Sequence, residues 1–171
     1  MNLVKAIATD VPGDGSCLFH AIAFPITSPD FSVNGQNLRD LTSSIIERHP
    51  NELLHGVTLS NWIVWDNPNT SVQEYARGLK KGMWGGALEM TILASLLNVN
   101  MFVYVMDPES SHRGRGKKCS RVTEVFADPT FLKLAVKRPN ITVNGSRGRQ
   151  GEICLLWVNK CHYMNLDILF R

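Results

Sequence analysis

A cysteine at the junction between a glycine-rich turn and an apolar run is the residue of this chain best placed to do chemistry. Residues 11–16 hold a proline and two glycines, and the apolar run 18–24 is predicted to be a buried helix, so Cys17 stands at a helix N-terminus. The first N–H groups of a helix have no partner and its dipole is positive there, which favours the reactive thiolate. The glycine-rich loop can also direct N–H groups at an oxyanion. The sequence therefore predicts a nucleophilic cysteine, which needs a base.

Five histidines are candidates for that base. His20 lies three residues after Cys17 on the same predicted helix, but the apolar residues that follow it favour a packing role. His162 follows a strand predicted over residues 153–159, where a strand end or tight turn can hold an imidazole over a cleft. We therefore expect His162 to be the base. Taken alone, the pair also fits a buried cysteine and a packed histidine. The other three histidines lie in polar or basic sequence: His49, His55 and His112.

Helices dominate the first half of the chain and strands the second, a pattern that predicts an α+β fold. Besides the run after Cys17, helices are expected over 34–49, 71–80 and 87–97, with Asn34 and either Thr70 or Ser71 as N-caps and Asn98 as the cap that ends the last helix. The segment 53–69 is expected to be irregular and anchored by Trp62 and Trp65. Strands are expected over 5–9, 101–106, 121–126, 131–136, 141–143, 153–159 and 163–170.

The composition indicates a soluble globular protein. The chain has 171 residues, 44% hydrophobic and 19% charged, with a net charge of +3, which is too mild to imply nucleic-acid binding. We expect one domain over residues 1–171, without a signal peptide or a membrane span. None of the four cysteines forms a C-x-x-C pair. A free Cys17 suits the chemistry above, so a reducing compartment is favoured over two disulfides.

Three motifs resemble those of the ovarian-tumour (OTU) cysteine proteases. Residues 14–19 (DGSCLF) look like the family's D-G-[NS]-C-[LF]-[FY] box, residues 84–89 (WGGALE) resemble its W-G-[GS]-x-x-E segment, and residues 161–163 (CHY) resemble its late histidine box. They occur in the family's order within residues 11–166, and their short spacing is more like viral OTU domains than most cellular ones. The resemblance implies a papain-like OTU fold, in which a central, mostly antiparallel sheet packs against helices and the catalytic cysteine begins a helix.

The resemblance also implies a deubiquitinase that hydrolyses the isopeptide bond after the C-terminal glycine of ubiquitin. Cys17 is then the nucleophile and His162 the general base and acid, while the backbone N–H groups of Asp14 and Cys17 form the oxyanion hole. Glu89 is expected to hold the loop before it. No metal or cofactor is implied; the expected protein is a monomer in the cytoplasm, the host's if it is viral, and its partner is ubiquitin, polyubiquitin or a ubiquitin-like modifier. The expected substrate channel consists of Gly15, Ser16, Trp84, Gly85, Gly86 and Tyr163.

One position departs from the family pattern. The family usually places Asp or Asn two residues after the histidine, where it orients the imidazole, but here that residue is Met164. Asn165 and Asp167 are the nearest polar replacements, yet both point to the opposite face from His162 in a regular strand. Three alternatives follow. A bulge lets Asn165 orient His162, the site is a Cys-His dyad, or the orienting group comes from elsewhere in the chain. Asn165 is the first of these expectations.

Other functions remain open at this level. A viral OTU protease can process its own polyprotein, and an OTU-like module can bind ubiquitin without cleaving it. A substrate tail ending Arg-Leu-Arg-Gly-Gly also calls for acidic groups, for which Asp30, Asp40 and Glu74 are candidates.

Two readings do not involve ubiquitin. The basic runs 112–118 and 147–149 can track nucleic-acid phosphates, although such runs are more often solvated loops and no aromatic residue is interleaved here. Four side chains are the number that a tetrahedral zinc site needs, but their spacing in the sequence does not resemble that of a known zinc knuckle: Cys119, Cys154, Cys161 and His162.

Overall fold

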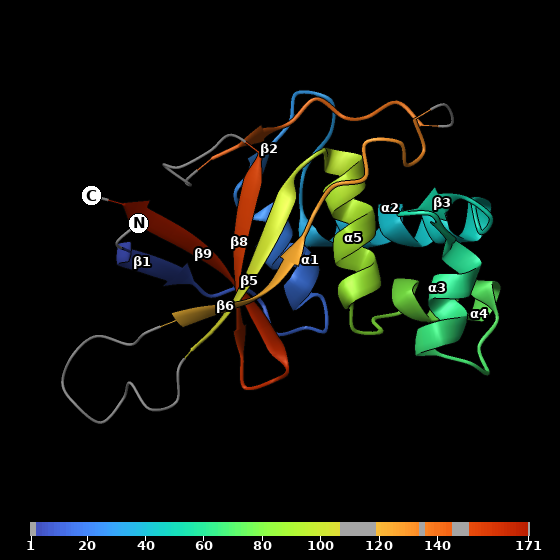
Figure 1. Cartoon of the computed structure of the whole chain (residues 1–171), viewed down its shortest axis with the longest axis horizontal. Helices are drawn as coiled ribbons and strands as arrows, with labels where there is room; N and C mark the ends of the chain where they lie inside the picture. The colour runs from blue at the N-terminus through green and yellow to red at the C-terminus, as the bar shows by residue number, and fades with distance from the viewer. Residues whose placement is uncertain (1–2, 107–118, 134–135, 145–150, 171) are drawn as a thin grey trace.

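A central sheet of five strands carries the fold. The structure, a computed structural model, describes residues 3–106, 119–133, 136–144 and 151–170. The strand order is β1-β9-β8-β5-β6, in which only the β5–β8 pair is parallel (Figure 1). The predicted mostly antiparallel sheet is therefore confirmed. Its strands are β1 (Leu3–Thr9), β5 (Asn100–Met106), β6 (Cys119–Val125), β8 (Glu152–Val158) and β9 (His162–Phe170).

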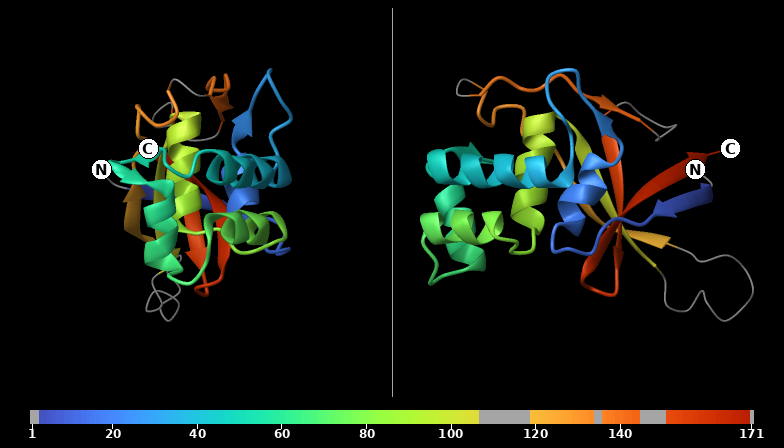
Figure 2. Two further views of the ribbon diagram at one scale, coloured as in Figure 1. Left: turned by 90° about the vertical axis from the view of Figure 1, so that its right-hand side faces the viewer. Right: turned by 180° about the vertical axis from the view of Figure 1, so that it is seen from behind.

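The helices gather on one side of this sheet, with α1 and α5 nearest to the strands and α3 and α4 farthest away (Figures 1 and 2). The α+β class is confirmed. No helix among the described residues is long and apolar enough to cross a bilayer. The helices are α1 (Cys17–Ala23), α2 (Gly35–Arg48), α3 (Leu59–Asp66), α4 (Val72–Lys80) and α5 (Ala87–Leu97).

Local sequence signals set most of the helix ends. The Asn34 side chain accepts the N–H of Asn37 at the start of α2, and Ser71 and Glu74 form a reciprocal capping box at the start of α4. Asn98 ends α5 in the left-handed conformation, with φ of 54°. These expected caps are confirmed.

The two middle strands are apolar on both faces. Met101 of β5 and Leu155 of β8 face the helices and join the main core, which α5 enters on nearly all of its sides. The alternate residues Phe102 and Cys154 point the other way, into a smaller cluster with Leu166 of β9. This period of two fixes which face of β9 meets the helices.

The segment 53–69 is not irregular as expected. It forms a hairpin of β3 (Leu53–Leu54) and β4 (Val57–Thr58), followed by α3. His55 and Gly56 both have positive φ, which suits a tight turn, and the Thr58 side chain caps α3. Trp62 does anchor the segment, through its N–H on the Leu54 carbonyl, but Trp65 is 63% exposed and does not.

The strand expected over 131–136 is also not found among its described residues. Residues 131–133 form a turn in which Leu132 has φ of 50°, and residues 134–135 lie outside the described part of the chain. Phe131 and Leu132 are apolar because they fill the core, not because they alternate across a strand. A second small sheet pairs β2 (Ile26–Thr27) with β7 (Thr142–Val143).

Candidate active site

Cys17 is the first residue of α1, as the sequence predicted. Its Sγ lies 4.0 Å from the carbonyl oxygen of Cys161, the residue directly before His162. The thiol is half-buried at the positive end of the helix, where unpaired N–H groups and the dipole favour negative charge. The fold thus brings the predicted nucleophile to the turn that carries the predicted base, although Cys17 and His162 lie 145 positions apart in the sequence.

Asp10 is the hydrogen-bond partner of the predicted base. His162 Nε2 lies 2.8 Å from Asp10 Oδ1, which also accepts the backbone N–H of Val11. The His162 hydrogen bond holds the pKa of the Asp10 carboxyl below its ordinary value, so this carboxylate stays ionised at neutral pH. With Nε2 bound to a carboxylate, Nδ1 is the ring nitrogen left for proton transfer with a thiol.

Strand pairing explains how Asp10 reaches the histidine. β1 runs antiparallel to β9 with Thr9 opposite Asn165, so the residue after β1 arrives beside the beginning of β9, where His162 stands. The turn before β9 is tight, because Asn159 and Lys160 both have positive φ and the N–H of Cys161 returns to the Val158 carbonyl. Two antiparallel pairings therefore position the His162–Asp10 pair.

Asn165 makes a different contact from the expected one. The pairing of β9 with β8 is continuous from His162 to Asn165, without a bulge, so Asn165 lies on the opposite face of the strand. Its side chain is 5% exposed and donates to the Ala21 carbonyl at 3.4 Å, near the end of α1. Met164 packs in the smaller apolar cluster. The orienting contact thus comes from elsewhere in the chain, which was one of the three alternatives.

The loop before Cys17 is fixed by side chains around it. Asp14 Oδ1 accepts the Ser16 N–H at 2.9 Å, and Asp14 Oδ2 lies 3.1 Å from His20 Nε2. The His20 contact lowers the pKa of the Asp14 carboxyl. The His20 ring lies so close to Gly35 that a Cβ there would approach Nδ1 to 2.3 Å. With one ring nitrogen on Asp14 and the other against α2, His20 packs as the sequence suggested.

A narrow cleft of about 130 Å³ lies in front of the thiol. The structure brings five predicted residues together there. Two other predicted channel residues face elsewhere, because the Ser16 hydroxyl is buried and the Gly86 N–H is directed at Glu89. The lining of the cleft consists of the five predicted residues, Gly15, Cys17, Trp84, Gly85 and Tyr163, together with Leu18, Trp157, Lys160 and Cys161.

Two aromatic groups border this cleft, one from the loop before α5 and one from the adjacent strands β8 and β9. Trp84 is 63% exposed, so its ring stands at the surface, not in the core. On the other side, Trp157 and Tyr163 stack with ring centroids 6.3 Å apart. A Cβ at Gly85 would come within 2.8 Å of a Leu18 methyl carbon, so this glycine allows the Trp84 loop to lie directly on α1.

Glu89 holds the Trp84 loop, as expected. Its Oε2 accepts the Gly86 N–H and its Oε1 accepts the Tyr75 hydroxyl, both at 2.7 Å. Burial raises the pKa of the Glu89 carboxyl, and the two hydrogen bonds act in the opposite direction.

The remaining candidates lie apart from the cleft. Asp30, Asp40 and Glu74 do not line it, and each has a local partner: the Asn140 N–H, the Gln36 amide and Ser71, respectively. The basic runs 112–118 and 147–149 lie outside the described residues.

The proposed zinc ligands are not assembled. In the described part of the chain no three His, Cys, Asp or Glu side chains are grouped to hold a metal ion, and all four cysteines are free.

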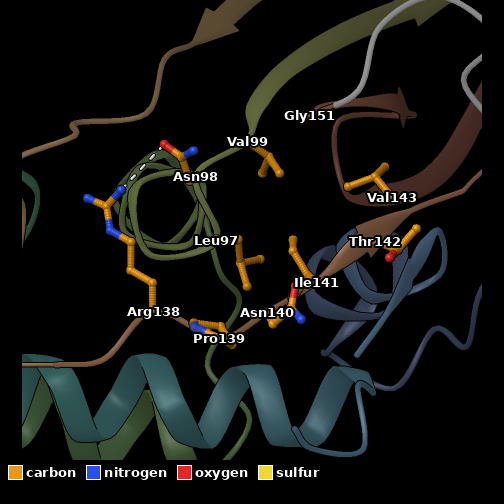
Figure 3. A pocket seen from close by; sticks show the side chains of 10 residues that line it. All are labelled: Leu97, Asn98, Val99, Arg138, Pro139, Asn140, Ile141, Thr142, Val143 and Gly151. Carbon is orange, nitrogen blue, oxygen red and sulfur yellow. Dashed lines mark hydrogen bonds between the residues drawn. The ribbon is translucent and has the colours of Figure 1, made fainter. Parts of the chain in front are cut away.

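A larger cavity of about 410 Å³ lies between the end of α5 and β7, where Arg138 reaches Asn98 (Figure 3). Its lining shares no residue with that of the cleft, so the two are separate, and His162 lines neither of them.

Two residues of the site were missed from sequence. Asp10 carries no local signal for its role, since its contact depends on the pairing of the first and last strands. Arg39, which donates to the Gly15 and Met83 carbonyls beside the cleft, did carry a signal. On α2 the buried residues Leu38, Thr42 and Ile46 lie one residue before Arg39 and three and seven residues after it. This helical spacing predicts that Arg39 stands at the edge of the buried face of the helix.

The chain is similar to known proteins in both sequence and fold. Over 94 residues it is 34% identical to ubiquitin thioesterase OTU1 of Saccharomyces cerevisiae, a match that covers 55% of this chain and 27% of that protein, so the chain spans about a quarter of its relative. Among solved structures, the viral OTU domain protease from Dera Ghazi Khan virus matches with a TM-score of 0.56 at 17% identity, covering 96% of this chain and 82% of that one.

An ovarian tumor domain solved in complex with ubiquitin matches with a TM-score of 0.50 at 22% identity, covering 94% of this chain and 69% of that one. These structural matches show a shared fold. The family model described as OTU-like cysteine protease matches residues 12–132, more than half of the chain. The chain belongs to the OTU-like cysteine protease family.

Proposed function

We propose that this chain is a deubiquitinase, a thiol isopeptidase that cuts the bond after the C-terminal glycine of ubiquitin. One observation carries the proposal: Cys17, at a helix N-terminus in a narrow cleft, lies against the turn that presents the His162–Asp10 pair. Family membership supports a cysteine protease. Ubiquitin as the substrate is supported by a relative named ubiquitin thioesterase and by a similar fold solved with ubiquitin.

The proposed reaction has two halves. The Cys17 thiolate attacks the carbonyl carbon of the terminal glycine, and the backbone N–H groups of Cys17 and Asp14 stabilise the resulting oxyanion. The C–N bond then breaks as protonated His162 gives its proton to the leaving lysine amine, which leaves a thioester on Cys17. A water molecule, deprotonated by His162, attacks the thioester and releases the ubiquitin carboxylate and the thiol.

The cleft supports a substrate tail without side chains at its end. Trp84 and the stacked Trp157–Tyr163 pair border a space of about 130 Å³, and two glycines, Gly15 and Gly85, are part of its lining. A tail that ends in two glycines fits these dimensions, whereas a bulky side chain next to the scissile bond would meet the aromatic rings. A ubiquitin-like modifier with the same ending is the second candidate substrate.

The setting of the domain is also part of the proposal. The chain acts as one monomeric domain over residues 1–171 in the cytoplasm. Four free cysteines support a reducing compartment, and the main core, which draws on residues from Val11 to Leu155, supports a single unit. A viral source is supported by the short motif spacing, although the sequence match to a yeast protein gives equal support to a cellular one.

Reporter cleavage tests the activity and the substrate together. The chain is incubated with fluorogenic C-terminal reporters of ubiquitin and of ubiquitin-like modifiers, and with a peptide substrate that lacks the ubiquitin body. We expect release from the ubiquitin reporter that is lost in Cys17→Ala. If only a modifier reporter is cleaved, the substrate is that ubiquitin-like modifier and not ubiquitin. If only the free peptide is cleaved, the result favours a polyprotein protease. If no substrate is cleaved, the proposal is rejected.

A further inference from the structure

A buried arginine outside the reacting groups contacts both loops that form the cleft. Arg39, on α2, is 1% exposed, which is rare for an arginine unless its charge is satisfied. Among the described side chains no carboxylate forms an ion pair with it, so neutral groups must satisfy its N–H donors. Those groups belong to the loop before Cys17, to the loop that carries Trp84 and to the end of α4 that leads into it.

The first pair of contacts reaches the loop before the nucleophile. Arg39 Nε donates to the Ser16 hydroxyl at 3.1 Å, and Nη2 donates to the Gly15 carbonyl at 2.5 Å. Gly15 has φ of 84°, a conformation that a side chain would disfavour, so an external contact at its carbonyl helps to hold it. These two bonds fix the segment that leads directly into Cys17.

The second pair of contacts reaches the loop that carries Trp84. Arg39 Nη1 donates to the Met83 carbonyl at 2.7 Å and also to the carbonyl of Leu79, in the last turn of α4. The same guanidinium lies 4.7 Å from the centre of the Phe19 ring on α1. Four hydrogen bonds therefore use four of its five donors: two reach the loop before Cys17, one reaches the Trp84 loop and one reaches the end of α4, where that loop begins.

The two loops also touch directly. A Cβ at Gly15 would come within 3.1 Å of the Gly82 carbonyl and 3.8 Å of the Trp84 ring. Because the loops are in contact and share one rigid planar group, displacement of either must break bonds that also hold the other.

We infer that Arg39 is a positioning residue that sets the oxyanion loop and the Trp84 loop at a fixed separation, and this inference rests on the proposed function for its catalytic consequence. The planar fork of arginine is what the role requires. Lysine keeps the charge but, with a single ammonium, cannot reach acceptors in both loops at once. Arg39→Lys therefore separates the bridging role from the charge.

Steady-state kinetics on the ubiquitin reporter test the catalytic consequence. We expect Arg39→Lys to lower kcat about 10- to 100-fold with KM changed by less than about threefold, because oxyanion donors act on the transition state. Alkylation of Cys17 by iodoacetamide, followed by mass spectrometry, needs a thiolate but no oxyanion hole, and its rate should stay within about twofold of the wild-type rate. Arg48→Lys, an exposed substitution on the same helix, is the matched control and should change none of these.

Amide hydrogen exchange tests the bridge without any substrate. In Arg39→Lys the peptides covering 12–18 and 81–86 should both exchange faster by about tenfold, while the peptide covering α3 exchanges as in the wild type. Ser16→Ala removes a single bond of the bridge and gives a second, milder variant, for which we expect the same two peptides to respond together.

The results that overturn the inference are distinct from those that overturn the function. Normal exchange in both loops for both variants, faster exchange in only one loop, or a kcat within threefold of wild type for Arg39→Lys would each reject the positioning role. A wild-type chain that cleaves no reporter would reject the proposed function, and the exchange experiment would still decide whether Arg39 bridges the loops.

Discussion

At the scale of single residues, the partner of the base is the point on which the catalytic proposal depends. Asp10 accepts a hydrogen bond from His162 at 2.8 Å, although it stands 152 residues away in the sequence. The carboxylate can fix the ring orientation and stabilise the imidazolium that forms when the thiol is deprotonated. The candidate site therefore combines Cys17, which lies beside the turn that carries His162, with Asp10, which is bonded to His162.

Removing the Asp10 carboxylate should slow turnover. We expect Asp10→Ala to lower kcat on a ubiquitin reporter by about 10- to 100-fold, because the ring of His162 is no longer held in a productive orientation. Asp10→Asn keeps an acceptor of the same shape and should retain more activity than Asp10→Ala. Equal activity of Asp10→Ala and the wild type would remove Asp10 from the mechanism.

The Asn165 side chain should affect stability more than turnover. Asn165→Ala removes the donor to the Ala21 carbonyl and leaves His162 and Asp10 in place. We expect kcat within about threefold of wild type and a free energy of unfolding lower by about 1–2 kcal/mol, measured by urea denaturation. A large loss of kcat with unchanged stability would instead restore Asn165 as the orienting residue.

At the scale of elements, the loop between α4 and α5 depends on a buried carboxylate at the start of α5. Glu89 accepts the Gly86 N–H and the Tyr75 hydroxyl, both of which are left without that acceptor in Glu89→Ala. We expect this variant to lower the free energy of unfolding by about 2–4 kcal/mol in urea. The exposed capping box of α4 provides a control, since Glu74→Ala should lower the free energy of unfolding much less than Glu89→Ala does. Similar losses in both variants would contradict the role given to Glu89.

Elements with a local signal could be predicted from sequence. Asn34, Ser71 and Asn98 mark helix ends by side chain or backbone preferences that act within a few residues, and they stand where expected. The hairpin at 53–58 and the eight-residue α3 could not be predicted in this way, because both are short and stabilised by tertiary contacts such as that of Trp62 with Leu54.

The same distinction between local sequence signals and tertiary contacts applies to the residues of the candidate site. The thiol at a helix start and the histidine after a strand follow from nearby sequence, so Cys17 and His162 were both predicted, and the structure places Cys17 beside the turn that carries His162. Asp10 and Arg39 act through partners more than 20 residues away, and only the strand pairing and helix packing reveal those partners. Asn165 was favoured because it is close to His162 in sequence, but the unbroken β8–β9 register directs it to the other face.

At the scale of the whole molecule, Asp128 joins distant parts of the chain and makes stability depend on pH. Burial raises the pKa of its carboxyl, but hydrogen bonds from Thr130 and from the His55 N–H outweigh this and lower the pKa below its ordinary value. A carboxyl with a lowered pKa in the folded state stabilises the fold above its ordinary, unfolded pKa of about 3.9, and this contribution is lost as pH falls through the folded value.

Asp128→Asn should therefore lower the free energy of unfolding at neutral pH and make its further decrease in acid smaller than in the wild type. We expect the free energy of unfolding at pH 7 to fall by about 1–2 kcal/mol, with a smaller difference from the wild type at pH 3. Urea denaturation across this range measures both. A difference between variant and wild type that does not shrink below pH 4 would show that Asp128 does not act through its charge.

The central claim is that the fold assembles Cys17 into a nucleophile directed at the tail of ubiquitin. A ubiquitin suicide probe, with an electrophile in place of the terminal carboxylate, tests nucleophile and substrate class in one measurement. We expect a single covalent adduct, located on Cys17 by mass spectrometry, that is absent in Cys17→Ala and slower to form in Asp10→Ala. An unlabelled wild-type chain, or an adduct on Cys161 that persists in Cys17→Ala, would contradict it.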